Sequence, residues 1–400
     1  MRTRLLLATV TVMLAGGQSR TITDSEVMRV HRSTLLIDTH NDVPSRTVEG
    51  FDIGSHAGTG HTDIARLKEG GVGAQFFAVY VAASYVNGNR SANRTLQMID
   101  TVRHDIIGRY PNDFVLATSA KDIEEAHRRG KIAALMGIEG GHAIEDSLRL
   151  LRDYYDLGVR YMTLTHSNTN NWADSSGDID DAKVKHHNGL TDFGKQVVRE
   201  MNRLGMMVDI SHVADKTFWD ALETSKAPIF ASHSSCRALT NHARNMTDDM
   251  IVALAKKGGV VQVNFYCGFI SQKFRDNDAA DTKALDARMA KETAGKNLSE
   301  PDRQVLSEKL RKEMGLSRAT LADVVDHIDH IRKIAGIDAI GIGGDFDGVS
   351  CTPIGLDDVS KYPNLTRALL EKGYSAEDIR KIYGGNFLRV MRAVEAAAGK

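Results

Sequence analysis

The stretch LLIDTHND at residues 35–42 is an apolar run that ends in a histidine and a carboxylate spaced two apart, His40 and Asp42. An apolar run bounded by polar residues is typical of a short buried strand. Because side chains alternate along a strand, His40 and Asp42 are expected to point to the same side. Imidazole nitrogen and carboxylate oxygen are both ligands for zinc-like ions, so this strand end is a candidate half of a divalent-metal site. Taken alone, the pair fits equally a solvated turn with incidental polar residues.

Short apolar runs alternate with longer amphipathic, charged segments from about residue 25 onward, which indicates repeated βα units and a parallel sheet. Eight runs are predicted strands: 35–39, 74–81, 132–138, 159–165, 207–210, 229–232, 260–264 and 339–343. Segments with helical periodicity lie between them, among them 192–204, 215–224, 247–257 and 321–334. We therefore predict a (β/α)8 TIM barrel of the metal-dependent amidohydrolase type, forming one domain over residues 25–400.

Chemistry-bearing residues gather where these predicted strands end, which is where (β/α)8 enzymes place their active sites. The residues at or just past the ends are His40 with Asp42, Tyr80, Glu139, His166, His212, His233, Asn264 with Tyr266, and Asp345. Such a concentration of His, Glu and Asp is not expected by chance in a chain with 15 histidines in 400 residues. This concentration favours a metal-binding role for His40 and Asp42 over a solvated turn.

The ligand-type residues form a set suited to two divalent ions. Glu139 is the predicted bridge, giving one oxygen to a metal held by His40 and Asp42 and the other to a metal held by His212 and His233. A water or hydroxide shared by the two ions would be a nucleophile at neutral pH, so hydrolysis of a carbonyl compound is the expected chemistry.

Composition and the absence of certain motifs exclude several classes of protein. The 51 basic residues nearly cancel the 52 acidic ones, which argues against a nucleic-acid partner. The three cysteines, Cys236, Cys267 and Cys351, lack CxxC spacing, so at most one disulfide is expected and no structural zinc ribbon. HExxH, GxSxG and GxxxxGK[ST] motifs do not occur, which removes single-motif zincins, serine hydrolases and P-loop enzymes.

Three segments fall outside the repeat. Residues 84–93 and 167–188 are polar, follow strands and are candidate lids over the barrel mouth. Residues 271–317 are densely charged and read as an insertion after the seventh strand; the alternative is a solvated helical excursion without a catalytic role. Among the other histidines, His142 is expected beside the metal ligands rather than among them. His186, His187, His327 and His330 are expected to be solvated.

The first residues have the layout of a secretory signal peptide: a basic start, an apolar run at 5–15 and small polar residues after it. We therefore predict a signal peptide at 1–19 and export to the periplasm or the medium, with an apolar segment packed on a cytoplasmic protein as the alternative. No later run approaches the ~20 apolar residues that span a bilayer, so a transmembrane span is not expected in the mature chain.

Seven motifs, in order along the chain, resemble the membrane (renal) dipeptidase family of the amidohydrolase superfamily (peptidase family M19 type). They are IDTHND at 37–42, GIEGGH at 137–142, LTHSN at 164–168, DISH at 209–212, SHSS at 232–235, RNMTDD at 244–249 and GGDFDG at 343–348. The resemblance implies a dizinc (β/α)8 barrel that cleaves dipeptides. It implies the same metal ligands: His40 and Asp42 on one zinc, His212 and His233 on the other, with Glu139 as the bridge.

The resemblance also implies three roles toward the substrate. His166 would stabilise the oxyanion that forms on the scissile carbonyl. Arg244 would bind the free carboxylate through its guanidinium fork. Asp345 would relay a proton to the leaving amine and is preferred over Asp347; it could also bind the free amino group. Tyr266 is a candidate pocket residue, although an aromatic there fits packing equally.

The sequence departs from the family at two points. Glycolipid-anchored members have a hydrophobic tail, whereas this chain ends in AAAGK at 396–400, so membrane anchoring is not carried over. The insertion has no counterpart in compact members, which leaves its role open.

We expect a zinc-dependent dipeptidase acting on L,L- and L,D-dipeptides, with a homodimer allowed. The alternatives are a binuclear amidohydrolase for another amide, ester or lactam, and a non-catalytic peptide-binding protein. The side-chain preference and the physiological metal stay open.

Overall fold

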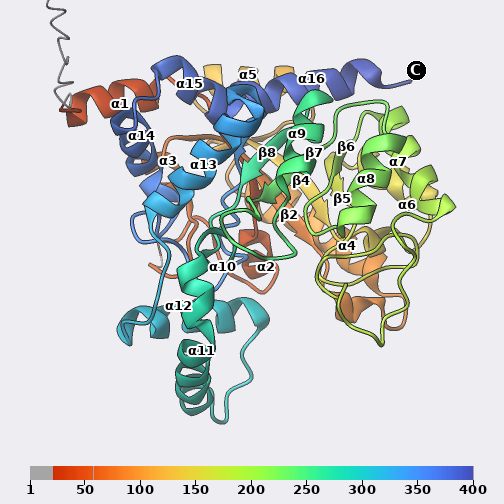
Figure 1. The fold of residues 1–400 in the computed structure, drawn as a ribbon, viewed down its shortest axis with the longest axis horizontal. Coiled ribbons are helices and arrows are strands. Elements are labelled where there is room, and N and C mark those ends of the chain that lie inside the picture. The colour runs from red at the N-terminus through yellow and green to blue at the C-terminus, as the bar shows by residue number, and fades with distance from the viewer. Residues whose placement is uncertain (1–20, 57, 400) are drawn as a thin grey trace, which may run out of the picture.

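The computed structural model describes residues 21–56 and 58–399. Eight parallel strands follow one another in chain order, each pairing with the next (Figure 1). They are β1 (Leu36–Asn41), β2 (Val72–Tyr80), β4 (Ile132–Glu139), β5 (Val159–Thr163), β6 (Met207–Asp209), β7 (Phe230–Ser234), β8 (Val260–Val263) and β9 (Ile340–Ile342). Each matches a predicted strand to within a few residues.

The barrel is nearly closed where β9 meets β1. The Asp345 backbone N–H donates to the His40 carbonyl (3.1 Å), and the Asp42 N–H donates to the Phe346 carbonyl (2.8 Å). Asn41 and Phe346 form an isolated parallel bridge at the same place. These contacts confirm the (β/α)8 fold and bring the two chain segments that follow the first and last strands side by side.

Helices cover the outside of the barrel and follow the strands in turn. They are α1 (Asp24–Arg32), α2 (Val43–Thr47), α3 (Ile64–Glu69), α4 (Ser91–Asp100), α5 (Ala120–Arg128), α6 (Leu148–Asp156), α7 (Asp192–Leu204), α8 (Asp215–Thr224), α9 (Asp248–Lys256), α10 (Cys267–Ile270), α11 (Gln272–Glu292), α12 (Glu300–Glu313), α13 (Leu321–Ala335), α14 (Tyr362–Glu371), α15 (Ala376–Arg380) and α16 (Asn386–Ala397). Short 3₁₀ or π segments occur at 83–86, 101–108, 141–144, 337–339, 359–361 and 381–385.

Aromatic side chains fill the barrel toward the amino ends of its strands. Phe76, Tyr161 and Phe230 are fully buried, and the Tyr161 ring lies 5.1 Å from Phe76 and 5.5 Å from Phe230 between ring centroids. Phe387 of α16 packs on Phe76 (5.3 Å), and Figure 1 shows α16 lying across this end of the barrel. The opening therefore lies at the opposite end, where the strands finish.

One strand was not predicted. β3 (Phe114–Leu116) pairs in parallel with residues 132–134 of β4, outside the barrel path. Three residues are too few to show a period, which explains why the pattern did not reveal it.

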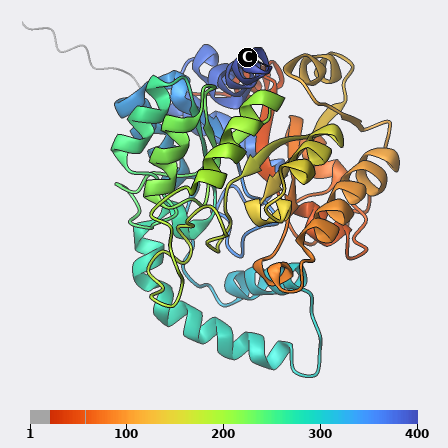
Figure 2. The same ribbon diagram turned by 90° about the vertical axis from the view of Figure 1, so that its right-hand side faces the viewer.

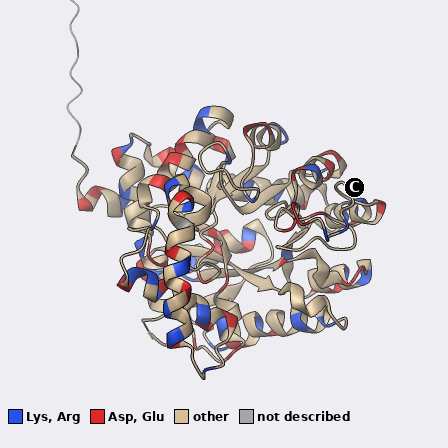
Figure 3. Cartoon of the chain, turned by 60° about the horizontal axis from the view of Figure 1, so that its bottom comes forward, with Lys and Arg blue, Asp and Glu red and all other residues tan. Residues whose placement is uncertain are grey.

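The predicted insertion after the seventh barrel strand is confirmed as α11 and α12, between β8 and α13. Figure 2 shows α11 running away from the barrel and the chain turning back, so that α12 returns to contact α2. Positive and negative residues are interspersed over the molecule (Figure 3), in keeping with the net charge of −1. Within the described residues, no helix has both the length and the apolar character needed to cross a membrane. The predicted signal peptide lies outside the described residues.

Candidate metal centre

His40 and Asp42 meet at the end of β1, as the strand alternation predicts. His40 Nε2 lies 3.2 Å from Asp42 Oδ2, and both side chains are almost fully buried. Asp42 follows the strand and precedes α2, so its carboxylate turns back over the barrel mouth. Within the described residues, no group meets His40 Nε2 in hydrogen-bonding geometry, although the atom is shielded from solvent. A buried nitrogen that is left unpaired among carboxylates is a candidate metal ligand.

The other ring nitrogen of His40 has a defined partner. The Tyr161 hydroxyl donates to the Thr39 carbonyl (3.1 Å), so it is an acceptor toward His40 Nδ1, 2.9 Å away. His40 Nδ1 is therefore the nitrogen that donates to Tyr161, which leaves Nε2 facing the barrel mouth. Burial alone would lower the pKa of His40, but Tyr161, Glu139 and Asp42 raise it well above its usual value, so without a metal ion the ring is held as a cation between the carboxylates. Tyr161 stands on β5 and has the room to reach His40 because residue 137 is glycine, where any Cβ would overlap the tyrosine ring.

Glu139, the last residue of β4, turns its two carboxylate oxygens toward different partners. Oε2 lies 3.6 Å from His40 Nε2. Oε1 lies 2.9 Å from His212 Nε2 and 3.3 Å from His233 Nε2. Burial alone would raise the pKa of Glu139, but His40 and His166 beside it hold that pKa well below the usual range. The carboxylate thus lies between two groups of ligand atoms, as a bridging ligand must.

His233 is oriented by a chain of hydrogen bonds beneath it. The Ser232 hydroxyl donates to Asp209 Oδ2 (2.6 Å), which makes its oxygen an acceptor for the Nδ1–H of His233 at 2.7 Å. The lone pair of His233 Nε2 consequently faces Glu139. Burial, followed by the charge of His40, lowers the pKa of His233, which favours the neutral ring that binds metal.

His212 is held in the left-handed backbone region, with φ at 65°. Its carbonyl accepts from the Ser176 N–H (2.8 Å), the Ser176 hydroxyl (3.0 Å) and the Thr165 hydroxyl (3.1 Å). Ser176 belongs to the polar loop 167–188. That loop, predicted as a lid, packs beneath His212 and fixes this uncommon conformation.

The donor set fits divalent metal ions. Ligand atoms lie within 4.8 Å of one another in three groups: His40, Asp42 and Glu139; Glu139, His166 and His212; and His40, His233 and Asp345. The first group is the predicted first site. The second pairs Glu139 with His212 as predicted and adds His166. His233 was predicted beside His212, and their Nε2 atoms are 2.9 Å apart.

His166 stands at the rim of this cluster and is partly exposed, with its Nε2 3.9 Å from Glu139 Oε1. Its ring packs edge-on against Tyr80, with 4.9 Å between ring centroids. Burial lowers the pKa of His166 despite the neighbouring Glu139. A neutral imidazole at the rim can donate a hydrogen bond to a substrate oxygen.

Arg244 lies behind His233 rather than on the wall of the cavity. Its guanidinium donates to the Ser234 hydroxyl (2.6 Å) and the His233 carbonyl (2.7 Å), while Nε is buried with no hydrogen-bond partner among residues 21–56 and 58–399. Burial lowers the pKa of Arg244 to about 10, so the side chain remains cationic at neutral pH.

Asp345 lies on the segment after β9, with φ at 61° and Oδ1 4.0 Å from His40 Nε2. Asn264, at the end of β8, donates to its Oδ2 (2.7 Å). Burial raises the pKa of Asp345 to about 8, which suits a group that accepts and returns a proton. Asp347 instead accepts from the His61 N–H (2.9 Å) and from Arg46 (3.4 Å).

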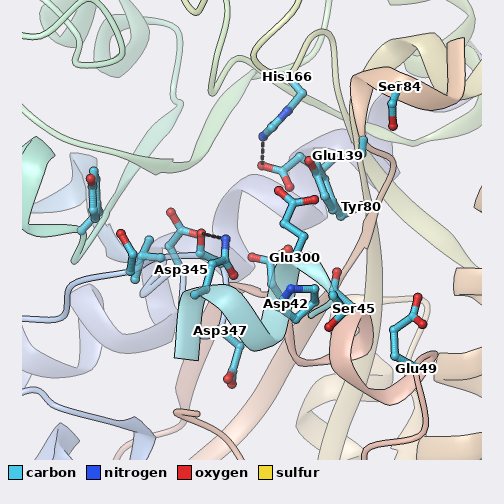
Figure 4. A pocket seen from close by; sticks show the side chains of 18 of the residues that line it. Asp42, Ser45, Glu49, Tyr80, Ser84, Glu139, His166, Glu300, Asp345 and Asp347 are labelled. Atoms are coloured by element: carbon cyan, nitrogen blue, oxygen red, sulfur yellow. Dashed lines mark hydrogen bonds and ion pairs between the residues drawn. The ribbon is translucent and has the colours of Figure 1, made fainter. Parts of the chain in front are cut away.

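A cavity of about 710 Å³ opens above these residues. Asp42, Glu139, His166 and Asp345 line it (Figure 4). His212 and, as predicted, Tyr266 also belong to its lining. Tyr266 also packs edge-on against Phe269, with 4.8 Å between ring centroids. Two further sections of wall come from Ser84 and Tyr85 of the first predicted lid and from residues 297–301 and 304 of the insertion. The insertion is therefore more than a solvated excursion.

The expectation that His327 is solvated is wrong. The side chain is fully buried, accepting from the Cys236 N–H (3.0 Å) at Nδ1 and lying 3.2 Å from the Ile270 carbonyl at Nε2. The many charged residues of α13 suggested a solvated helix, but His327 lies on the face of α13 that packs against the barrel. His330 is half-buried beside Asp248, and His142 bonds to the Val81 carbonyl (2.9 Å) next to the ligands, as predicted.

Cys267 and Cys351 form one disulfide, with their Cα atoms 5.6 Å apart, and Cys236 is a buried free thiol. The bond joins α10, at the base of the insertion, to the segment after β9 that carries Asp345. It closes a sequence separation of 84 residues, so both sides of the cavity mouth are covalently connected.

Comparison with known proteins gives one consistent result. The model of the membrane dipeptidase family, peptidase family M19, matches residues 24–400. An uncharacterized dipeptidase of Schizosaccharomyces pombe is 36% identical over 400 residues, covering 95% of this chain and 85% of that protein. The crystal structure of the probable dipeptidase PvdM from Pseudomonas aeruginosa has a TM-score of 0.77 at 26% identity, covering 94% of this chain and 99% of that one.

A metallopeptidase of Rhodobacter sphaeroides has a TM-score of 0.71 at 25% identity, covering 90% of this chain and 99% of that one. That structure holds a phosphinate mimic of the dipeptide L-Ala-D-Ala.

Proposed function

The chain belongs to the membrane dipeptidases, peptidase family M19, and from this premise we propose that it is a zinc-dependent dipeptidase. The observation that carries the proposal is the position of Glu139. One of its oxygens faces His40 and the other faces His212 and His233, as a carboxylate shared by two ions requires.

In this proposal His40 and Asp42 would hold one zinc ion, His212 and His233 would hold a second, and Glu139 would be shared by both sites. Such a pair of ions, when bound, lowers the pKa of a shared water and polarises a carbonyl oxygen. The protein orients the donors itself, since Tyr161 and Ser232 fix the ring tautomers of His40 and His233.

The remaining residues act on the substrate. His166 donates a hydrogen bond to the oxygen on which negative charge develops. Asp345 accepts the proton of the attacking water and delivers it to the leaving amine, a role that its position supports, with Oδ1 4.0 Å from His40 Nε2 and Oδ2 held by Asn264. Arg244 is proposed for the free carboxylate because it is cationic and lies directly behind His233, although it does not itself line the cavity.

The proposed substrates are L,L-dipeptides and dipeptides with a D residue at the second position. The phosphinate mimic of L-Ala-D-Ala in the Rhodobacter sphaeroides relative supports the second group. Recognition of a free carboxylate by Arg244 favours two-residue substrates, because a longer peptide would place a neutral amide there.

We propose further that the protein is exported. The disulfide between Cys267 and Cys351 supports this proposal, because such bonds persist mainly in oxidising compartments. Fusing residues 1–24 to a reporter enzyme that is active only after export would test it. A reporter that stays inactive would contradict the proposal. The homodimer remains a prediction.

The function is tested by loading the purified protein with zinc, measuring metal content, and assaying L,L- and L,D-dipeptides. We expect about two ions per chain and hydrolysis of at least one dipeptide. Asp42→Asn should bind one ion and lose most activity. Arg244→Lys should impair dipeptide cleavage while sparing an ester or amide that lacks a free carboxylate. Two bound ions with no dipeptide cleaved would overturn the proposal.

A further inference from the structure

The wall contributed by the insertion brings a carboxylate into the cavity from a part of the chain that the metal site does not use. Glu300 is the first residue of α12 and lines the cavity together with Ser45 and Glu49 (Figure 4). Ser45 lies in α2, and Glu49 follows two residues after that helix ends. We call the space between Ser45, Glu49 and Glu300 the α2–α12 subsite.

The α12 wall is fastened to the barrel and is not a loose flap. Glu308 of α12 is buried, accepts from the His61 ring, and accepts from the Thr352 hydroxyl at 2.5 Å. The Gln304 side chain donates to the Gly348 carbonyl (3.3 Å), on the segment that carries Asp345. These contacts anchor the helix that Glu300 begins, while the Glu300 side chain itself is exposed where it lines the cavity.

The charges around the subsite leave one carboxylate without a cation. Glu49 pairs with Arg94 at 3.7 Å, and Asp347 pairs with Arg46 at 3.4 Å. Asp42 and Glu139 belong to the proposed metal ligands. Among the described residues, none forms an ion pair with Glu300. With the metals bound, this side of the cavity thus keeps a negative charge that a substrate group can meet.

Ser45 provides a second, independent indication of a ligand. Its hydroxyl is buried and has no hydrogen-bond partner in the part of the chain that the structure describes, although the residue lines the cavity and is only 8% exposed. An unpaired buried hydroxyl costs free energy unless something occupies it. An ammonium or guanidinium group only donates hydrogen bonds, so both the hydroxyl oxygen of Ser45 and the carboxylate of Glu300, which line the same cavity, are acceptors for it.

The position of the subsite indicates which end of the dipeptide it serves. Arg244, proposed to bind the carboxyl terminus, follows β7. Ser45 and Glu49 of the α2–α12 subsite instead follow β1 in the chain. Because β1 and β9 meet where the barrel closes, these residues lie beside the segment after β9 that carries Asp345. With the scissile bond above Glu139, the residue on the β1 side is the amino-terminal one.

We propose that the α2–α12 subsite selects dipeptides whose amino-terminal residue carries a cationic side chain, with Glu300 as the specificity-determining residue. This inference rests on the dipeptidase function proposed above. It assigns the charged insertion a role in substrate choice, since the insertion supplies Glu300.

The test compares kcat/KM for Lys-Ala and norleucine-Ala, which differ chiefly by the side-chain ammonium. For the wild type we expect a preference of about three- to five-fold for Lys-Ala, the size of a partly exposed ion pair, and a weaker preference in high salt. Glu300→Gln should bring the ratio toward one, and Glu300→Lys should bring it below one. The ratio for Ala-Lys over Ala-norleucine should stay unchanged in both variants.

Glu313→Gln is the matched control, since Glu313 ends the same helix, pairs with Lys309 at 3.7 Å and does not line the cavity. It should keep the wild-type ratio. Calorimetry on two phosphinate dipeptide mimics, one with lysine and one with norleucine as the amino-terminal residue, measures the same preference as a ratio of affinities and needs no turnover. It therefore separates failure of the subsite from failure of the dipeptidase proposal. An equal lysine preference in wild type and Glu300→Gln, or none in the wild type, would overturn the inference.

Discussion

His40 Nδ1 lies 2.9 Å from the hydroxyl of Tyr161, which donates its own proton to the Thr39 carbonyl. The tyrosine ring belongs to the apolar filling of the barrel, where it packs between Phe76 and Phe230. One side chain thus joins the hydrophobic interior to the metal centre. The geometry of the site depends on how well the barrel below it is packed.

Tyr161→Phe is expected to weaken metal binding while keeping the fold. The ring still fills the interior, but His40 loses the acceptor that fixes its proton on Nδ1, and loss of such a partner typically lowers metal affinity about 10–100-fold. Competition with a zinc chelator measures the affinity. Tyr383→Phe is the control, because Tyr383 is also a buried tyrosine and its hydroxyl bonds to Thr366 and not to a proposed metal ligand. Equal zinc affinity in both variants would contradict the role given to Tyr161.

The docking of α12 is expected to weaken in acid. Burial alone would raise the pKa of Glu308, but His61, Lys312 and Thr352 hold that pKa well below its usual range. A carboxylate with a lowered pKa stabilises the fold above its unfolded pKa of about 4.3, and this contribution is lost as the pH falls through the folded value.

Glu308→Gln should therefore lower Tm most near neutral pH, and the difference from wild type should shrink between about pH 5 and pH 3. The loss at neutral pH is expected to be about 1.5–3 kcal/mol, the value of a hydrogen bond to a charged group. Thermal unfolding across this pH range measures it. Glu313→Gln, exposed on the same helix, should show no such pH dependence. A constant difference at every pH would show that the Glu308 carboxylate is not held in its ionised form.

The strand pattern and the residues at strand ends were predictable because they depend on local sequence. Buried parallel strands are apolar runs, and the barrel rule then places their last residues together. His40, Glu139 and Asp345 were found this way. The backbone turn at Asp345, with φ at 61°, shows no signal in the residue type itself.

The supporting residues were not predictable, since they act through contacts between distant segments. Tyr161 lies within a predicted strand and looks like core, and only the fold places its hydroxyl beside His40, 121 residues away. Glu300 lies in a segment whose dense charge resembles a solvated face. A pattern of charged residues does not show which side chain of a helix faces the protein, as the buried His327 on α13 also illustrates.

The disulfide is expected to contribute strongly to stability. Cys267 and Cys351 close a loop of 84 residues, and bonds of this kind contribute about 2–4 kcal/mol, chiefly by restricting the unfolded chain. A variant with both cysteines changed to serine should unfold at lower temperature and should no longer respond to reductant, whereas reductant should lower the Tm of the wild type. If the reduced wild type unfolds at its original temperature, the bond does not restrain the cavity mouth.

Gly348→Ala is expected to damage the site more than the fold. A Cβ at Gly348 would press on Asp42 Oδ2 and Asp345 Oδ1, so glycine is what lets the last barrel segment lie against both carboxylates. Displacing two such groups by a fraction of an ångström should lower kcat/KM by more than about tenfold, with a stability loss of about 1–3 kcal/mol from overpacking. Gly385→Ala is the control, since its φ is −57° and the nearest atom to a new Cβ is 3.3 Å away. Steady-state rates on one dipeptide and thermal unfolding, measured on the same samples, separate the loss of activity from the loss of stability. Full activity in Gly348→Ala would show that the backbone at residue 348 does not need to lie this close to Asp42 and Asp345.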